Sequence, residues 1–365
     1  MVQFQLSDVV ADSLSILIVN IYQIIKLAKL NESMDVLEEL LVKAVNSQDP
    51  FLSQVAVHLI HAGGKRLRPI LTIASAAASY LSTSLAENDL ENISLTSIPK
   101  EVLLGGVAVE LVHLGSLYHD DVMDEATTRR KVETVNARWG NLVARVAGDF
   151  LLARASGVAA DLVAEVSSLL AETIARLCEG QVIELQDTFN LNRTEASYLQ
   201  AISGKTASLM ATACHIGALL SGVSDEKIQH LRSFGESFGM IFQLRDDILD
   251  LIGAEEILGK QGQDLIEGIY TLPVIHTLGD PIKGPELQSL ITGVLDQPTL
   301  EKARSIIIES GGIRFSLETA KMFADKAKQS LYALGDNAGV QSLSALSNYM
   351  VESIEISVNG LENKK

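Results

Sequence analysis

The sequence is poor in cysteine and proline, and no stretch rich in Pro, Gly or Ser divides it. Its 365 residues include 2 cysteines and 7 prolines. Cys178 and Cys214 lie far apart, which argues against a disulfide framework or a cysteine metal site and favours free thiols in a reducing compartment. Without a linker or repeat, we expect residues 1–365 to form a single domain. The few prolines and the 47% hydrophobic content predict a largely helical globule with a sizeable core.

Positive charge is also scarce. The chain has 29 Lys and Arg residues against 46 Asp and Glu residues, a formal net charge of −17. This balance argues against nucleic acid or an anionic membrane surface as the main partner. Any local cluster of basic residues therefore stands out.

The N-terminal part lacks a clear membrane span. Residues 13–30 begin as an apolar run, but Asn20, Gln23, Lys26 and Lys29 interrupt it. There is no basic leader region or obvious cleavage site. We expect a packing helix within residues 1–30, no transmembrane span and a cytoplasmic protein, with a membrane anchor as the alternative.

Apolar residues recur at helical spacing almost everywhere, and no convincing β-type alternation is present. We therefore predict an all-α fold. Residues 82–97 and 253–271 are expected to be loops, and the end at 359–365 is expected to be frayed. The predicted helices cover 31–47, 50–62, 100–126, 141–162, 163–187, 194–221 and 225–252, with another beginning near Pro69 and more to the end of the chain.

Two aspartate clusters share the spacing D-D-x-x-D, at 120–124 and 246–250. Residues four apart lie on one face of a helix, so the first and last aspartates of each cluster are neighbours. Burying such carboxylates unpaired costs several kcal/mol, so a cation is needed. Mg²⁺ commonly takes one or two carboxylates together with phosphate oxygens. The segments before both clusters are apolar nearly all round, which predicts two central helices and a deep, apolar-walled cavity with a Mg²⁺–diphosphate site at its rim.

Basic clusters alternate with these aspartates along the chain. GGKRLRP at 63–69 carries Lys65, Arg66 and Arg68, and Arg129 and Arg130 follow the first aspartates. Arg offers a bidentate fork to phosphate, and Lys a compact charge. Each cluster alone could be solvated surface, but their ordered alternation on an acidic protein favours anion binding. Further lysines stand in GKT at 204–206 and in GK at 259–260.

The motifs GGKRLRP, LYHDDVMDEATTRR, GKTASL and FQLRDDILD occur in this order with typical spacing. On these motifs the chain resembles the trans-prenyltransferases, the head-to-tail isoprenyl diphosphate synthases, over nearly its whole length. The resemblance implies a homodimeric, all-α, single-domain bundle around a deep central apolar cavity. It also implies a Mg²⁺-dependent prenyltransferase, a polyprenyl diphosphate synthase, that condenses isopentenyl diphosphate with an allylic diphosphate.

The resemblance also implies residue roles. Asp120, Asp124, Lys205 and Asp246 would be most directly catalytic. By sequence alone, His113 could equally be a core histidine. The metal ligands, for three Mg²⁺ ions per site, would be Asp120, Asp121, Asp124, Asp246, Asp247 and Asp250. Arg129, Lys205 and Lys260 would contact the allylic diphosphate with Thr206 and Gln243 close by, and Lys65, Arg68, His113 and Arg130 would hold isopentenyl diphosphate.

The chemistry implied is coherent with this composition. Metal ions and basic side chains neutralise a departing diphosphate, and the double bond of isopentenyl diphosphate attacks the allylic cation that remains. Loss of a proton completes a chain five carbons longer. No side-chain nucleophile is needed or evident, and apolar walls keep water from the cation.

Small residues beneath the first aspartates bear on product length. Short-chain members of the family usually have an aromatic residue four or five positions before the first Asp, where this chain has Ser116 and Gly115, with Val112 a turn below. At about 5.4 Å per turn, a growing tail could pass several turns, which predicts a product of about C30 to C50. The alternative is that another helix supplies the floor.

The chain departs from the family pattern in one loop. Ile269 stands where the family often has Lys, and the segment at 259–264 is one residue shorter than usual and lacks its Pro. A class I terpene cyclase is one alternative function, but GGKRLRP and Arg130 argue against it. A non-catalytic subunit of a heteromeric synthase is another, but both aspartate motifs are intact.

Overall fold

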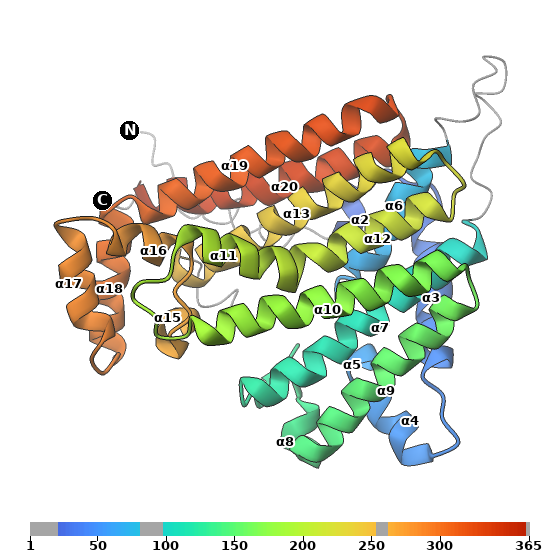
Figure 1. The fold of residues 1–365 in the computed structure, drawn as a ribbon, viewed down its shortest axis with the longest axis horizontal. Coiled ribbons are helices and arrows are strands. Elements are labelled where there is room, and N and C mark those ends of the chain that lie inside the picture. The colour runs from blue at the N-terminus through green and yellow to red at the C-terminus, as the bar shows by residue number, and fades with distance from the viewer. Residues whose placement is uncertain (1–20, 81–97, 253–261, 363–365) are drawn as a thin grey trace, which may run out of the picture.

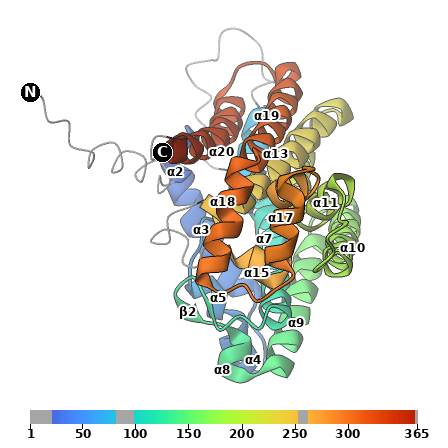
Figure 2. The ribbon, with the colours of Figure 1, turned by 90° about the vertical axis from the view of Figure 1, so that its left-hand side faces the viewer.

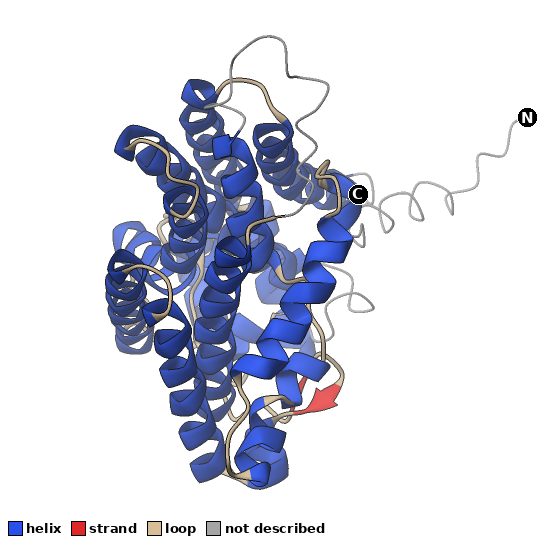
Figure 3. Cartoon of the chain, turned by 90° about the vertical axis from the view of Figure 1, so that its right-hand side faces the viewer, coloured by secondary structure: helices blue, strands red, loops and turns tan. Residues whose placement is uncertain are grey.

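This computed structural model describes residues 21–80, 98–252 and 262–362. They form a bundle of helices with one short strand pair (Figures 1 and 3), which confirms the all-α prediction. The elements are α2 (Ile21–Ile24), α3 (Leu30–Ala44), α4 (Pro50–Ala56), α5 (His58–His61), α6 (Leu67–Tyr80), α7 (Lys100–Met123), β1 (Thr128–Arg129), β2 (Val132–Glu133), α8 (Val135–Trp139), α9 (Asn141–Ala160), α10 (Ala164–Gln186), α11 (Glu195–Ile202), the π-helix η1 (Ser203–Ala207), α12 (Ser208–Leu219), α13 (Asp225–Ile252), α15 (Gln263–Glu267), α16 (Leu272–Leu278), α17 (Lys283–Ile291), α18 (Gln297–Glu309), α19 (Gly312–Leu331), the 3₁₀ turn η2 (Tyr332–Leu334) and α20 (Ala338–Glu362).

Two long helices at the centre carry the aspartates at their C-terminal ends. Helix α7 packs against α3, α6, α9 and α12, and α13 packs against α12, α19 and α20. Figure 2 looks along the bundle and shows α7 among the other helices. Among the described residues only α7 is long and apolar enough to cross a membrane, and 72% of that stretch is buried within the protein. Its apolar character therefore reflects its place in the core.

The two chain ends differ from the prediction. Within residues 1–30, the described part contains α2, which ends at Ile24, and Lys29 (φ 57°) precedes α3 as its N-cap. The packing helix expected within residues 1–30 therefore does not extend to residue 30. Packing of this segment is confirmed, since Ile21 and Ile25 are buried and α2 contacts α20. The predicted fraying at 359–362 is also wrong, because α20 continues to Glu362 and is anchored by buried Val358.

Three local features were not expected from periodicity. The predicted helix at 194–221 is interrupted by the π-helix η1, and the predicted loop at 253–271 contains α15. Strands β1 and β2 form a hairpin too short to show β-type alternation, in which Thr128 pairs with Glu133. The rest of the predicted loops, 82–97 and 253–261, lies outside the described residues.

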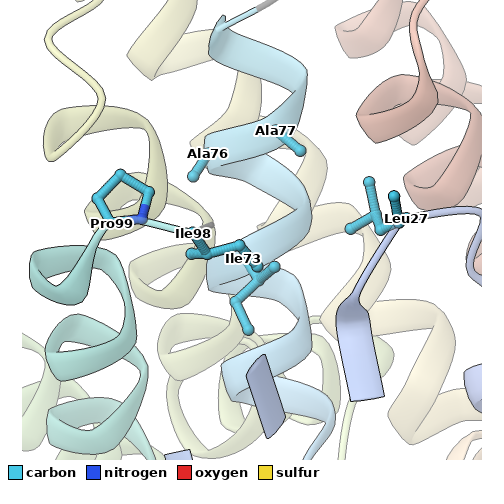
Figure 4. Close-up of a pocket in the computed structure, with 7 residues that line it drawn as sticks. Leu27, Ile73, Ala76, Ala77, Ile98 and Pro99 are labelled. Atoms are coloured by element: carbon cyan, nitrogen blue, oxygen red, sulfur yellow. The ribbon is translucent and has the colours of Figure 1, made fainter. Parts of the chain in front are cut away.

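A small apolar pocket lies between α6 and the segment that leads into α7 (Figure 4). Ile73, Ala77 and Ile98 are among its lining residues, and its volume is about 10 Å³. That space holds no more than one water molecule, and its lining is apolar. It is a packing defect of the core rather than a ligand site.

Candidate active site

The first aspartate motif occupies the last turn of α7. Asp124 is the C-terminal cap, and its backbone N–H donates to the Asp120 carbonyl over 2.8 Å. Asp121 is fully buried and accepts a hydrogen bond from Arg129 Nε (2.6 Å) at Oδ1, while its Oδ2 has no hydrogen-bond partner among the described residues. Burial raises the pKa of Asp121 despite this arginine. The motif thus carries carboxylate charge that the protein only partly compensates.

The β1–β2 hairpin delivers two of the predicted anion-binding arginines. Its turn residues Arg130 and Lys131 both have positive φ (53° and 66°), an unfavourable conformation for side chains other than glycine. Arg130 donates to the carbonyl of Gly63. Gly64 has φ 140°, a conformation that favours glycine, and a Cβ there would lie 2.7 Å from the Arg130 guanidinium, which would have to shift.

A buried carboxylate organises the basic residues on this side. Glu110, the one acidic residue in the apolar middle of α7, pairs with Arg66 Nη1 over 3.1 Å. Arg68 and Arg130 also lie near enough to act on its charge. Burial and these arginines hold the pKa of His113 well below its usual range, so its imidazole is neutral. Sequence reasoning missed Glu110, whose signal was a lone charge within a buried helix.

Lys205 is placed by an unusually close helix contact. A Cβ on Gly180 of α10 would lie 2.4 Å from the Lys205 backbone nitrogen, so α10 and η1 touch through glycine. Lys205 Nζ pairs with Glu184 over 2.5 Å. Burial alone would lower the pKa of Lys205, but Glu184, together with Asp120, raises it above its usual value. A π-turn within an α-helix frequently marks a functional site.

The second aspartate motif is more completely held by the protein. Asp247 is 3% exposed and accepts hydrogen bonds from Tyr198 Oη (2.6 Å) and Gln243 Nε2 (2.7 Å). Gln243 in turn accepts from Thr206 Oγ1 over 2.7 Å. Burial raises the pKa of Asp247 to about 7. Asp246 lies 3.2 Å from Arg245 Nη1.

A further carboxylate joins this motif from the following loop. The backbone N–H groups of Gln263 and Asp264 donate to Asp250 over 3.2 and 3.4 Å. The pKa of Asp264 is raised well above its usual range because it is desolvated beside Asp247 and Asp250. Sequence reasoning missed Asp264, Glu184, Tyr198 and Arg245. Lys260 lies outside the described residues.

Two cavities adjoin the aspartates. A cleft of about 720 Å³ lies between α7, α9 and α10, with Asp120 and Lys205 in its wall. A second space of about 370 Å³ is lined by Lys65, Asp246 and Asp250. Arg68 links the two sides electrostatically, because the charges of both Asp120 and Asp246 act on its pKa.

The residues expected to set product length are placed differently from one another. Ser116 lines the larger cleft, whereas Val112 is completely buried. A Cβ on Gly115 would lie 3.1 Å from the Gly148 carbonyl oxygen of α9. Gly115 therefore serves a helix contact, and Ser116 is the residue at the cavity surface.

The acidic residues suit a hard divalent cation. Their donor atoms are carboxylate oxygens, and burial raises the pKa of Asp120, Asp121 and Asp250 as well as that of Asp247. Among the described residues, no group of three or more possible ligands is already assembled. Carboxylate oxygens of this kind suit Mg²⁺, which takes few carboxylates and completes its coordination with water and substrate phosphate.

The chain is similar to known proteins over most of its length. The sequence model described as "Polyprenyl synthetase" matches residues 49–307. The chain is 36% identical over 324 residues to "Heptaprenyl diphosphate synthase component 2" of Bacillus subtilis (strain 168), covering 88% of each. It is 35% identical to "Nonaprenyl diphosphate synthase" of Mycobacterium tuberculosis, over 86% of this chain and 90% of that one.

The fold is also similar to those of solved polyprenyl synthase structures. A decaprenyl diphosphate synthase from Rhodobacter capsulatus superposes with a TM-score of 0.79 at 31% identity, covering 89% of this chain and 97% of the other. A polyprenyl synthase from Caulobacter crescentus CB15, complexed with calcium and isoprenyl diphosphate, gives a TM-score of 0.78 at 32% identity, with 88% and 94% covered. The resemblance inferred from the motifs is confirmed: the chain belongs to the polyprenyl synthetase family.

Proposed function

We propose that this prenyltransferase extends an allylic diphosphate by repeated head-to-tail condensation with isopentenyl diphosphate. The product would be an all-trans prenyl diphosphate of about C30 to C50, whose tail would occupy the cleft that Ser116 lines. The observation that carries the proposal is the pairing of two carboxylate motifs with basic residues beside a cleft of about 720 Å³. The names of the hepta-, nona- and decaprenyl relatives support the same range.

Each wall of the site has a distinct task. When bound, Mg²⁺, three ions in our proposal, would neutralise the diphosphate and make it a better leaving group. Asp120 and Asp124 would bind Mg²⁺ on one wall of the site, and Asp246 would bind it on the other. Lys205 and Arg129 would donate to the oxygens of the allylic diphosphate, where preorganised charges are most effective.

The basic cluster around Glu110 would hold the second substrate. Arg68 and Arg130 would provide positive charge for the diphosphate of isopentenyl diphosphate, together with Lys65, which lies beside Asp246. His113, whose pKa is lowered by burial and by its arginine neighbours, would add a hydrogen bond rather than charge. The apolar part of the cleft would receive the growing tail and exclude water from the cation.

We also propose that the enzyme works as a cytoplasmic homodimer. Leu142 and Val146 of α9 are 75% and 61% exposed, and Val182 and Leu185 of α10 are also exposed beside the open cleft. A second copy on this face would bury them. The free thiols of the two cysteines fit a reducing compartment.

The dimer is tested by Leu142→Asp, with Val294→Asp as the control. Val294 is 87% exposed and lies between α17 and α18, away from the cleft. In light scattering, wild type and V294D should have twice the chain mass and L142D should have the monomer mass. Dimeric L142D would contradict the assignment of this face.

The reaction is tested with the single purified chain, labelled isopentenyl diphosphate, farnesyl diphosphate and Mg²⁺. Chromatography should show prenyl diphosphates of about C30 to C50, and none with a chelator present. Cyclic hydrocarbons would indicate a terpene cyclase. No turnover would overturn the proposal that this chain is catalytic by itself.

A further inference from the structure

We propose that Tyr198 is a positioning residue that fixes Asp247 and, through it, sets the divalent-ion affinity of the second aspartate motif. The inference deepens the proposed function and rests on it. Tyr198 belongs to α11, outside every motif that carries the family resemblance. Its hydroxyl lies within the protein and is aimed at a carboxylate rather than at the cleft.

Asp247 has both carboxylate oxygens occupied by protein donors. Tyr198 Oη donates to Oδ2 over 2.6 Å, and Gln243 Nε2 donates to Oδ1 over 2.7 Å. Tyr198 is 1% exposed, so water cannot replace its hydroxyl without rearrangement. By contrast, the neighbouring Asp246 keeps 44% of its side chain accessible. Asp247 is therefore arranged to hold the motif in place, and Asp246 to meet a cation.

The ring of Tyr198 is itself held. The Arg193 guanidinium carbon lies 5.5 Å from the ring centroid. Arg193 is buried, donates from Nη1 to the Tyr270 carbonyl over 3.0 Å, and approaches Asp187 to 3.5 Å. A cation over an aromatic face fixes ring orientation as well as adding binding energy. The hydroxyl is therefore presented to Asp247 in one direction.

The same hydrogen bonds reach the other wall of the site. Thr206 Oγ1 donates to Gln243 Oε1 over 2.7 Å, and Gln243 Nε2 in turn donates to Asp247. Thr206 follows Lys205 in η1. The chain Thr206–Gln243–Asp247–Tyr198 therefore ties the lysine segment to the second motif. Residues that orient carboxylate ligands in this way typically change metal affinity by about 10- to 100-fold when they are removed.

The test compares two tyrosine-to-phenylalanine variants. Tyr198→Phe removes the donor to Asp247. Tyr118→Phe removes an equally buried hydroxyl that donates to the Val55 carbonyl over 2.7 Å and whose hydrogen-bond partners are backbone groups. Mg²⁺ binding would be measured by calorimetry in the presence of inorganic diphosphate, and turnover as a function of Mg²⁺ concentration.

We expect Y198F to weaken Mg²⁺ binding about 10-fold, with turnover largely restored by excess Mg²⁺. Y118F should show a comparable drop in melting temperature but an unchanged Mg²⁺ midpoint. A folded Y198F with the wild-type midpoint would overturn the inference. If Y198F does not fold, Gln243→Leu removes the other donor to Asp247 and should shift the same midpoint; an unchanged midpoint overturns the inference equally.

Wild type and Asp246→Asn in the same assay separate this inference from the proposed function. Wild-type turnover that is lost in D246N supports the function whatever Y198F does. Absence of wild-type product would instead refute the function.

Discussion

The two aspartate motifs have the same spacing but are held by different chemistry. At the first, the neighbouring partners are cations, Arg129 at 2.6 Å from Asp121 and Lys205 beside Asp120. At the second, Asp246 also lies 3.2 Å from a cation, Arg245 Nη1, but Asp247 and Asp250 accept hydrogen bonds from an uncharged hydroxyl, a side-chain amide and two backbone N–H groups.

This difference separates two ways of holding like charges together. The cations near the first motif come from separate elements, the hairpin and η1. The neutral donors at the second motif fix carboxylate directions without cancelling their charge. The two motifs therefore differ in how the protein stabilises their carboxylates.

The largest effect should come from the first motif. We expect Asp120→Asn to lower kcat/KM about 10³-fold, because it removes a ligand for the charge that stabilises the departing diphosphate. Asp247→Asn should cost only about 10-fold, since asparagine can still accept a hydrogen bond from Tyr198. Asp161→Asn, at the exposed end of α9, is the control. Equal losses in D120N and D247N would erase the distinction between the motifs.

Removal of a cation should have the next largest effect. Lys205→Met should lower kcat/KM for the allylic substrate about 10²-fold, because a buried charge-assisted contact to diphosphate is lost. Lys326→Met, on the exposed side of α19, should be silent. Steady-state kinetics with varied allylic diphosphate checks this. A change confined to the KM of isopentenyl diphosphate would instead indicate that Lys205 contacts that substrate and not the allylic diphosphate.

The cleft below the first motif should control product length. Ser116→Phe is expected to shorten the product by several isoprene units with a smaller change in rate, since its side chain enters the cleft. Gly115→Phe would instead press on α9 and should lower the melting temperature. Ser289→Phe on α17 controls for added surface hydrophobicity. An unchanged product from S116F would place the floor on another helix.

The smallest effect should be a pH dependence of stability in the metal-free protein. Asp247 has a pKa of about 7 when folded, against 3.8 as its ordinary value. A folded carboxyl with a raised pKa binds more protons than the unfolded one, so its contribution is present below pH 4 and is lost as pH rises through 7.

Urea unfolding with a chelator tests this pH dependence. The midpoint should fall between pH 5 and pH 8 in wild type, and less so in D247N. Added Mg²⁺ should restore stability most at the higher pH, where protons compete least. A wild-type midpoint that rises over this range would contradict the assignment.

Much of the fold was predictable because apolar residues at helical spacing mark the buried face of each helix. The limits of α13 match the prediction of 225–252, and α7 lies within that of 100–126. The π-turn at η1 was not predicted; it coincides with a close contact of Gly180 with Gly204, a pairing between separate segments of the chain. The boundary predicted before residue 31 agrees with the structure, in which α3 begins at Leu30.

The sequence by itself determined the chemistry: carboxylates and cations in a fixed order on apolar helices suffice for a metal-assisted diphosphate site. Only the tertiary structure decided how each carboxylate is satisfied. Tyr198 and Asp247 are 49 positions apart, and Glu110 meets Arg66 across 44. Such partners have no periodic signature, because hydrogen bonds depend on distance in space and not on separation along the chain. Packing likewise turned Gly115 towards α9 and left Ser116 at the surface of the cleft.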